Sequence, residues 1–117
     1  MSNQETKIQQ EIRLALGRIK NLRLFRNETG QLPDPCTDRW VQFGLAKGSS
    51  DLIGFKTVEI TEEHIGQKIA QFVSIEVKTP KGRPTEIQKN WLQCIKSAGG
   101  ISGIARSSED AKIILDI

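Results

Sequence analysis

The chain has 117 residues, which is room for one domain with a single hydrophobic core. Its 37% hydrophobic and 26% charged residues are typical of globular proteins and exclude a disordered chain. No apolar run approaches the roughly 20 residues of a transmembrane helix, and the polar N-terminus does not resemble a secretory signal, so we expect a cytoplasmic protein. A net charge of +3 is compatible with a polyanionic partner but does not require one.

The first predicted element is a helix over residues 3–20, in which apolar residues recur at three- and four-residue spacing. The residues of this stripe are Ile8, Ile12, Ala15, Leu16 and Ile19. On a helical wheel the stripe covers an arc of about 100°, and Glu5 falls inside it. Glu5 is therefore an acid on the inward-facing side. The alternative is a structural role at the helix start, because Ser2-x-x-Glu5 has the spacing of a capping box.

Alternating apolar and polar residues then predict strands, separated by turns rich in Gly, Pro, Asn and Asp. Their ranges are 22–27, 39–43, 51–60 and 69–79. Because the connections are short, this order favours an antiparallel meander. The loop over residues 45–50 is rich in Gly and Ser and delivers Asp51 to the start of its strand.

A second helix is predicted over residues 85–98, followed by a strand over 101–105 and a short helix that starts after Ser107. Gln88 lies on the apolar stripe of the second helix. Thr85-x-x-Gln88 again has capping-box spacing, so a helix-start role is the alternative. The element order predicts a single α/β domain over residues 1–117, with a central mixed sheet flanked by helices.

Few residues of this chain suit the commonest catalytic and metal-binding chemistries. The only histidine, His64, lies in a polar stretch that resembles a turn, which argues against histidine catalysis or zinc ligation. Cys36 and Cys94 are far apart and have no partner at metal-ligand spacing, so both are expected to be free thiols.

The most informative stretch is the strand that contains Glu76 and Lys78. Residues two apart in a strand share a face, so this acid and this amine stand side by side. Asp51 supplies a second carboxylate that a neighbouring strand could bring beside them. Two carboxylates and a lysine suit metal-assisted phosphodiester cleavage. The alternative is an exposed ion pair between Glu76 and Lys78, worth about 0–1 kcal/mol, although an apolar strand expected to be central makes this less attractive.

Basic residues gather near this predicted site and in the N-terminal quarter of the chain, where they could follow a phosphate backbone. The residues that we expect to contact nucleic acid are Arg26, Lys47, Lys81 and Arg83.

Several motifs, taken in order and spacing, make the chain resemble one nuclease family. They are Glu5-x-x-Ile8-Gln9, Arg26-Asn27, Phe43-Gly44, Gly48-Ser49-Ser50-Asp51-Leu52-Ile53-Gly54, Ile75-Glu76-Val77-Lys78-Thr79, Gln88 and Ala98-Gly99-Gly100. Together they resemble the virus-type replication-repair nuclease (VRR-NUC) family, a branch of the PD-(D/E)XK superfamily, although the loop before Asp51 lacks the proline of the superfamily's name. The resemblance implies a restriction-endonuclease-like core.

The resemblance also assigns roles. It implies that Asp51, Glu76 and the backbone carbonyl of Val77 hold Mg²⁺ or Mn²⁺, with Glu5 as a further candidate ligand. It implies that Lys78 is the catalytic lysine and that Gln88 orients the lysine, a water or a phosphate. The residues expected to act in catalysis are therefore Glu5, Asp51, Glu76, Lys78 and Gln88.

By the same resemblance, the chain is expected to be a metal-dependent DNA endonuclease of viral, phage or bacterial origin. The implied enzyme is a homodimer that cuts branched DNA, such as four-way (Holliday) junctions, in replication, recombination or repair. Two alternatives from other classes are a non-catalytic nucleic-acid-binding module with the same fold and a structural or partner-binding subunit. The binding module predicts salt-sensitive DNA affinity without cleavage, and the structural subunit predicts neither.

Overall fold

The computed structural model describes residues 2–117 in two compact units, one ending at Lys56 and the other spanning Thr57–Ile117. The N-terminal unit opens with helix α1, Asn3–Leu16, which begins where the Ser2 hydroxyl accepts a hydrogen bond from the Glu5 backbone N–H at 3.1 Å. The prediction of a helix as far as residue 20 is too long. The helix ends at Gly17, a residue of low helix propensity, and Asn21 then adopts a left-handed backbone conformation with φ of 67°.

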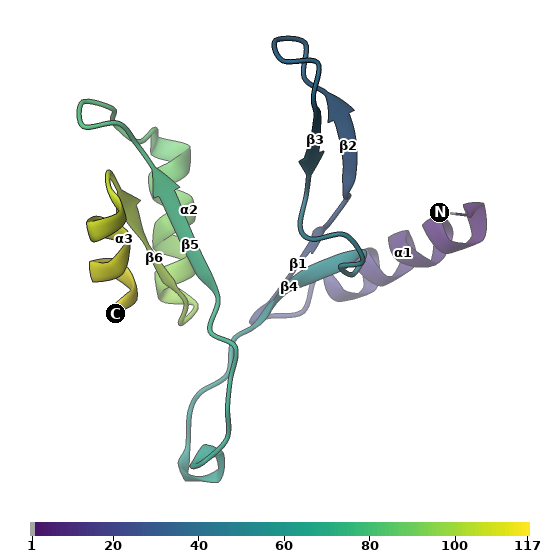
Figure 1. Cartoon of the computed structure of the whole chain (residues 1–117). Helices are drawn as coiled ribbons and strands as arrows, with labels where there is room; N and C mark the ends of the chain where they lie inside the picture. Colours follow the sequence, from purple (N-terminus) through teal and green to yellow (C-terminus); the bar gives the residue numbers. More distant parts are fainter. Residues whose placement is uncertain (1) are drawn as a thin grey trace. The chain divides into compact units, whose positions relative to one another are not determined.

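The strands of this unit are nested. The outer pair, β1 (Leu22–Arg26) and β4 (Leu52–Lys56), and the inner hairpin, β2 (Gly30–Pro33) and β3 (Trp40–Phe43), are both antiparallel (Figure 1). The predicted meander is therefore wrong, because β1 pairs with a strand beyond the hairpin instead of with its neighbour in sequence. Gly54 permits this close pairing, since a Cβ there would lie 1.8 Å from the carbonyl oxygen of Arg23.

Helix α1 lies against one face of the β1–β4 pair, and Phe25 and Phe55 lie on the other face, with ring centroids 6.4 Å apart. The inner hairpin keeps its apolar side chains exposed. Leu32 and Val41 are paired on one face of it and are 61% and 50% exposed. Trp40 is 68% exposed near the end of this hairpin.

The C-terminal unit begins with a long segment over residues 57–72 that contains a single 3-10 turn, η1 (Glu62–His64). The Thr61 N–H donates to His64 Nδ1 at 3.0 Å, so the histidine closes a turn, as expected. The predicted strands 51–60 and 69–79 are both shorter than expected, because residues 57–72 leave the sheet pairing that the apolar pattern suggested.

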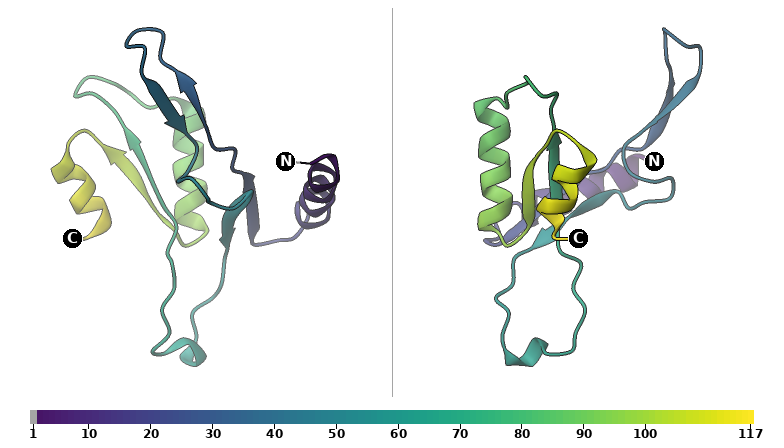
Figure 2. Two further views of the ribbon diagram at one scale, coloured as in Figure 1. Left: turned by 45° about the vertical axis from the view of Figure 1, so that its right-hand side comes forward. Right: turned by 60° about the vertical axis from the view of Figure 1, so that its left-hand side comes forward.

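The remaining strands, β5 (Val73–Val77) and β6 (Ile101–Ala105), run parallel, and helix α2 (Glu86–Ser97) connects them. Helix α2 and the last helix, α3 (Ser108–Leu115), lie on opposite faces of this pair (Figure 2). This is the helix–strand order that the sequence predicted for the C-terminal part.

The core of the C-terminal unit lies between α2 and β6. Leu92 and Ile95 are buried there, and Ile95 is only 2% exposed; Ala105 of β6 is also buried, on the face that α3 covers. The one buried polar side chain described, Ser102, donates from Oγ to the Leu92 carbonyl at 2.6 Å, so its burial leaves no unmet hydrogen bond.

The chain thus belongs to the mixed α/β class, as predicted, but the predicted central sheet is not found in residues 2–117. The described strands form three separate two-stranded sheets. The single-domain prediction stays a prediction. Cys36 and Cys94 are free thiols, as expected, and no helix of the described chain is long and apolar enough to cross a membrane.

Candidate active site

In the N-terminal unit, Glu5 and Asp51 line the same groove. Glu5 lies in the first turn of α1 and Asp51 immediately precedes β4, and the groove between them has a volume of about 270 Å³. Its other lining residues are Ile8, Gln9, Ile12 and Leu52. The apolar stripe of α1 therefore carries Glu5 towards the start of β4, as the helical wheel predicted, and two carboxylates share one hollow.

Glu5 is placed at the helix start, but its carboxylate does not cap the helix. The Ser2 hydroxyl caps the Glu5 N–H, whereas the described residues include no hydrogen bond from the Glu5 side chain back to the helix start. The capping-box alternative is thus only half fulfilled. The carboxylate of Glu5 has no hydrogen bond or ion pair with residues 2–117 and can act as an oxygen ligand.

The loop that precedes Asp51 is held by the side chain of Asn27, just after β1. Its Nδ2 donates to Ser49 Oγ at 2.7 Å and to the Ser50 carbonyl at 2.9 Å, and its Oδ1 accepts from the Leu45 N–H at 3.2 Å. The Asn27 N–H also donates to the Asp51 carbonyl at 2.9 Å. The Arg26-Asn27 motif was noted in the sequence, but this positioning role was not predicted, because it links residues 18–23 positions apart.

In the C-terminal unit, Glu76 lies on the face of β5 that α2 covers. It lines a hollow of about 290 Å³ together with residues of both elements, which are Ser74, Ile75, Ile87, Gln88, Trp91 and Leu92. Lys78 follows β5, and its N–H donates to the Ala105 carbonyl at 3.0 Å, so the strand pairing continues through it. Val77, whose carbonyl is the expected backbone ligand, stands between them as the last residue of β5.

The ion-pair alternative for Glu76 and Lys78 is not found. In residues 2–117 neither side chain takes part in an ion pair or hydrogen bond, and both are partly buried. A partly buried acid without a partner is costly to keep unless it has a function or a ligand. The two side chains are therefore available for chemistry.

Gln88 has the helix-start role that the sequence analysis gave as the alternative to a catalytic role. Its Oε1 accepts from the Thr85 N–H at 2.9 Å, and its own N–H donates to the Thr85 hydroxyl at 3.2 Å, which completes a capping box at the start of α2. It also lines the hollow that contains Glu76. The cap fixes the orientation of the amide and leaves its Nε2 to donate to another group.

Trp91, the next turn of α2, closes the side of the same hollow. Its indole N–H donates to Ser74 Oγ at 2.8 Å, which ties the helix to the strand two residues before Glu76. Trp91 remains 42% exposed, so it lies at the edge of the packed layer and not inside a core.

The four predicted nucleic-acid contacts are exposed and belong to loops or strand ends. Lys47, Lys81 and Arg83 have no hydrogen bond or ion pair from their side chains within residues 2–117. Arg26 differs, because it pairs with Glu28 and its charge is partly offset. Lys47, Lys81 and Arg83 are thus better placed to meet a phosphate than Arg26.

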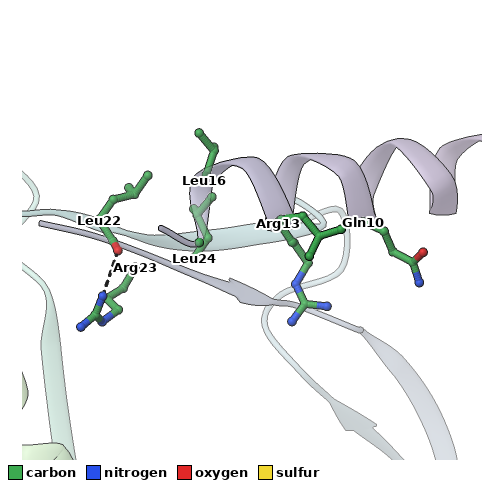
Figure 3. Close-up of a pocket in the computed structure, with 8 residues that line it drawn as sticks. Gln10, Arg13, Leu16, Leu22, Arg23 and Leu24 are labelled. Atoms are coloured by element: carbon green, nitrogen blue, oxygen red, sulfur yellow. Dashed lines mark hydrogen bonds between the residues drawn. The ribbon is translucent and has the colours of Figure 1, made fainter. Parts of the chain in front are cut away.

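A second hollow in the N-terminal unit, of about 490 Å³, lies at the other end of α1 (Figure 3). It is bounded by Gln10, Arg13 and Leu16 of the helix and by Leu22, Arg23 and Leu24 of β1. None of the predicted catalytic residues lines it. The larger volume therefore does not mark the place where the chemistry-bearing residues gather.

The carboxylates fit a divalent cation by the chemistry of their donors. No group of three His, Cys, Asp or Glu side chains comes together in the described part of the chain, and the acids occur as Glu5 with Asp51 in one unit and Glu76 in the other. Mg²⁺ keeps several waters and commonly takes only one or two carboxylates, so a cage of three is not needed. The oxygen donors suit Mg²⁺ or Mn²⁺ and do not suit a thiolate- or imidazole-binding metal.

The comparison with protein families covers most of the chain. The family model described as the VRR-NUC domain matches residues 3–109, which is most of the chain and includes every predicted site residue. The protein therefore belongs to the VRR-NUC family, a family of nucleases. In the same comparisons, no curated protein and no solved structure matches the chain.

Proposed function

We propose that this protein is a metal-dependent DNA endonuclease that hydrolyses phosphodiester bonds, with Asp51, Glu76 and Lys78 as its central residues. The observation that carries the proposal is the presence, in a VRR-NUC chain, of Glu76 and Lys78 as partly buried charged side chains without ion-pair partners in residues 2–117. A partly buried charge without a partner is unfavourable unless a ligand or a function compensates for it.

The oxygen ligands that we propose for Mg²⁺ or Mn²⁺ are Asp51 in the N-terminal unit and Glu76 with the Val77 carbonyl in the C-terminal unit. Glu5, which shares a groove with Asp51, would add a carboxylate or orient a water. When bound, a divalent cation lowers the pKa of water and offsets negative charge on the phosphate. The other tasks belong to the protein. In the hydrolysis, the oxygen of a water bonds to phosphorus, a bridging P–O bond breaks, and the leaving oxygen takes up a proton.

Lys78 would donate hydrogen bonds from Nζ to the attacking water or to a non-bridging phosphate oxygen, where negative charge develops. Gln88 would donate from Nε2 to the same group or to the phosphate, since its Oε1 is already engaged with Thr85. Lys47, Lys81 and Arg83 would contact neighbouring phosphates and fix the strand in register.

The preferred substrate that we propose is branched DNA, including four-way junctions, and the active form that we propose is a homodimer. Both are what the resemblance to the family implies. A two-fold assembly also has a physical reason, because symmetric incision of paired strands needs two sites related by symmetry. A dimer-sized particle in light scattering and paired cuts on a junction are the expected observations.

The test is a cleavage assay on single-stranded, duplex, flap and four-way-junction DNA, with and without Mn²⁺. We expect cuts only with the cation, and we expect Glu76→Gln and Lys78→Ala to reduce the rate by at least about 10³-fold, since each removes a group that stabilises the transition state. The control is Glu109→Gln, which removes a carboxylate that only pairs with Lys112 on the surface of α3.

Circular dichroism and thermal unfolding of each variant show whether the fold is kept. Cleavage that persists unchanged in both site variants would disprove the proposed site. Salt-sensitive DNA binding without cleavage under any divalent ion would instead identify a non-catalytic binding module.

A further inference from the structure

One arginine that the nuclease chemistry does not use makes an unusual set of contacts. Arg106 follows β6 directly, and its Nη1 donates to the carbonyl oxygens of Thr79 and Gly82, each at 2.6 Å. The Pro80 carbonyl is 3.5 Å from the same nitrogen. A single guanidinium therefore contacts three carbonyls of the turn that follows Lys78.

The register of the parallel strands explains why Arg106 reaches this turn. Val77 pairs with Ala105, and the Lys78 N–H donates to the Ala105 carbonyl at 3.0 Å. Lys78 and Arg106 are thus the next residues on two neighbouring strands. The chain leaves the sheet at Thr79, and the guanidinium of Arg106 donates to carbonyl groups of the residues where it leaves.

The turn has little else to hold it. Inside the turn there is one backbone hydrogen bond, from the Gly82 N–H to the Thr79 carbonyl at 3.0 Å, and Pro80 has no N–H to donate. The hydrogen bonds from Arg106 involve a charged donor and are therefore stronger than bonds between neutral groups. The fixed position of this turn depends mainly on Arg106.

The backbone of Arg106 is itself held by the first turn of α3. Its backbone N–H donates to Asp110 Oδ2 at 2.9 Å, and the Asp110 N–H donates to the Ser107 hydroxyl at 3.1 Å. The start of α3 thus fixes the backbone of Arg106, and Arg106 in turn fixes residues 79–82. This contact chain lies wholly in the C-terminal unit.

From these contacts we infer that Arg106 is a positioning residue for the cleavage reaction. It holds the 79–82 turn so that Lys78, which directly precedes the turn, keeps a fixed place relative to the reacting phosphate. This inference rests on the proposed nuclease function. Because Arg106 acts through Lys78, its loss affects the cleavage step more than the affinity for DNA.

The test compares Arg106→Ala, Arg106→Lys and the control Lys96→Ala. Lys96 lies in the same unit, and its side chain has no hydrogen bond or ion pair within residues 2–117, so the control removes one positive charge without removing a carbonyl contact. The measurements are the single-turnover cleavage rate with Mn²⁺ at saturating DNA, and the DNA affinity with Ca²⁺ at several salt concentrations.

We expect Arg106→Ala to lower the single-turnover rate roughly 10- to 100-fold, the size expected for a small misplacement of a reacting group. We expect the DNA affinity and its salt dependence to match those of Lys96→Ala. Arg106→Lys should recover much of the rate, because an ammonium group can donate to the same carbonyls, and it also serves if Arg106→Ala does not fold.

Three outcomes are distinguishable. A wild-type protein that does not cut disproves the nuclease function itself. A wild-type protein that cuts, with Arg106→Ala and Arg106→Lys as fast as Lys96→Ala, disproves only the positioning role. A loss confined to DNA affinity, with the salt slope reduced by about one, would mean that Arg106 contacts a phosphate directly, and it too would overturn the inference.

Discussion

Helix α1 of the N-terminal unit has no buried residue, whereas α2 of the C-terminal unit buries Leu92 and Ile95 against its sheet. Both helices carry a predicted site residue one turn from their start. Glu5 keeps its carboxylate free of the helix cap, and Gln88 uses its amide oxygen to complete one. The same spacing of polar residues in sequence thus serves two different purposes.

The two units also position their site residues by different means. The loop before Asp51 is held by the neutral amide of Asn27, and the turn after Lys78 is held by the charged guanidinium of Arg106. In each case a residue next to the partner strand holds the irregular segment beside the site residue. This comparison shows that a site residue at a strand end needs a second residue, distant in sequence, to fix it.

The largest expected difference between the units is in their stability. Ile95→Ala should lower the free energy of unfolding by about 2–5 kcal/mol, because it leaves a cavity in the only well-buried layer described. Leu14→Ala, at a position that is 77% exposed on α1, should change it by less than about 0.5 kcal/mol. Urea denaturation of both variants measures the difference, and equal losses would contradict it.

Glu5→Gln and Gln88→Glu exchange the carboxylate and amide side chains and so test which of the two residues acts in catalysis and which caps its helix. Glu5→Gln should leave stability unchanged, because the carboxylate makes no capping bond, and should lower the cleavage rate roughly 100-fold through loss of a charged group. Gln88→Glu should keep the cap, since Glu also completes a capping box, and should slow cleavage because Nε2 is lost.

For these two variants, thermal unfolding and the cleavage rate are measured on the same preparations. A Gln88→Glu protein with normal stability and normal cleavage would assign Gln88 to the cap alone. A loss of stability in Glu5→Gln would contradict this prediction and would mean that the Glu5 carboxylate stabilises the start of α1.

A smaller effect is expected at Asn27. Asn27→Ala removes three side-chain hydrogen bonds to the loop before Asp51 and should cost about 1–2 kcal/mol of stability. It should also weaken Mn²⁺ binding, since Asp51 would be less firmly placed. Calorimetric titration with Mn²⁺ tests this, with Asn90→Ala on α2 as the amide-deletion control; equal affinities would mean that Asn27 only supports the fold.

Much of the local structure could be predicted from the sequence. The apolar spacing of α2 and α3 and the alternation of β1, β3 and β6 identified these elements, because each depends on neighbours within a few residues. The same holds for Glu5 on the apolar stripe of α1. Their periodicity follows from helix and strand geometry alone.

The errors concern pairing and length. The meander prediction was wrong because the residues of β1 do not indicate which strand it pairs with. Its partner is β4, which follows the β2–β3 hairpin in sequence. The predicted strands were too long because apolar alternation continues into residues 57–72, where the chain does not pair. Pairing is a long-range property, and a pattern of period two does not identify the partner strand.

The sequence by itself determined the chemistry of this protein: its acids, its lysine and the motif spacing that placed it in a nuclease family. Only the tertiary structure decided which side chains are free and which are engaged, and which distant residues hold the site segments. Asn27 and Arg106 act across more than 20 positions of sequence. No local periodicity records such contacts, because they arise only when strands far apart in the chain are brought into register.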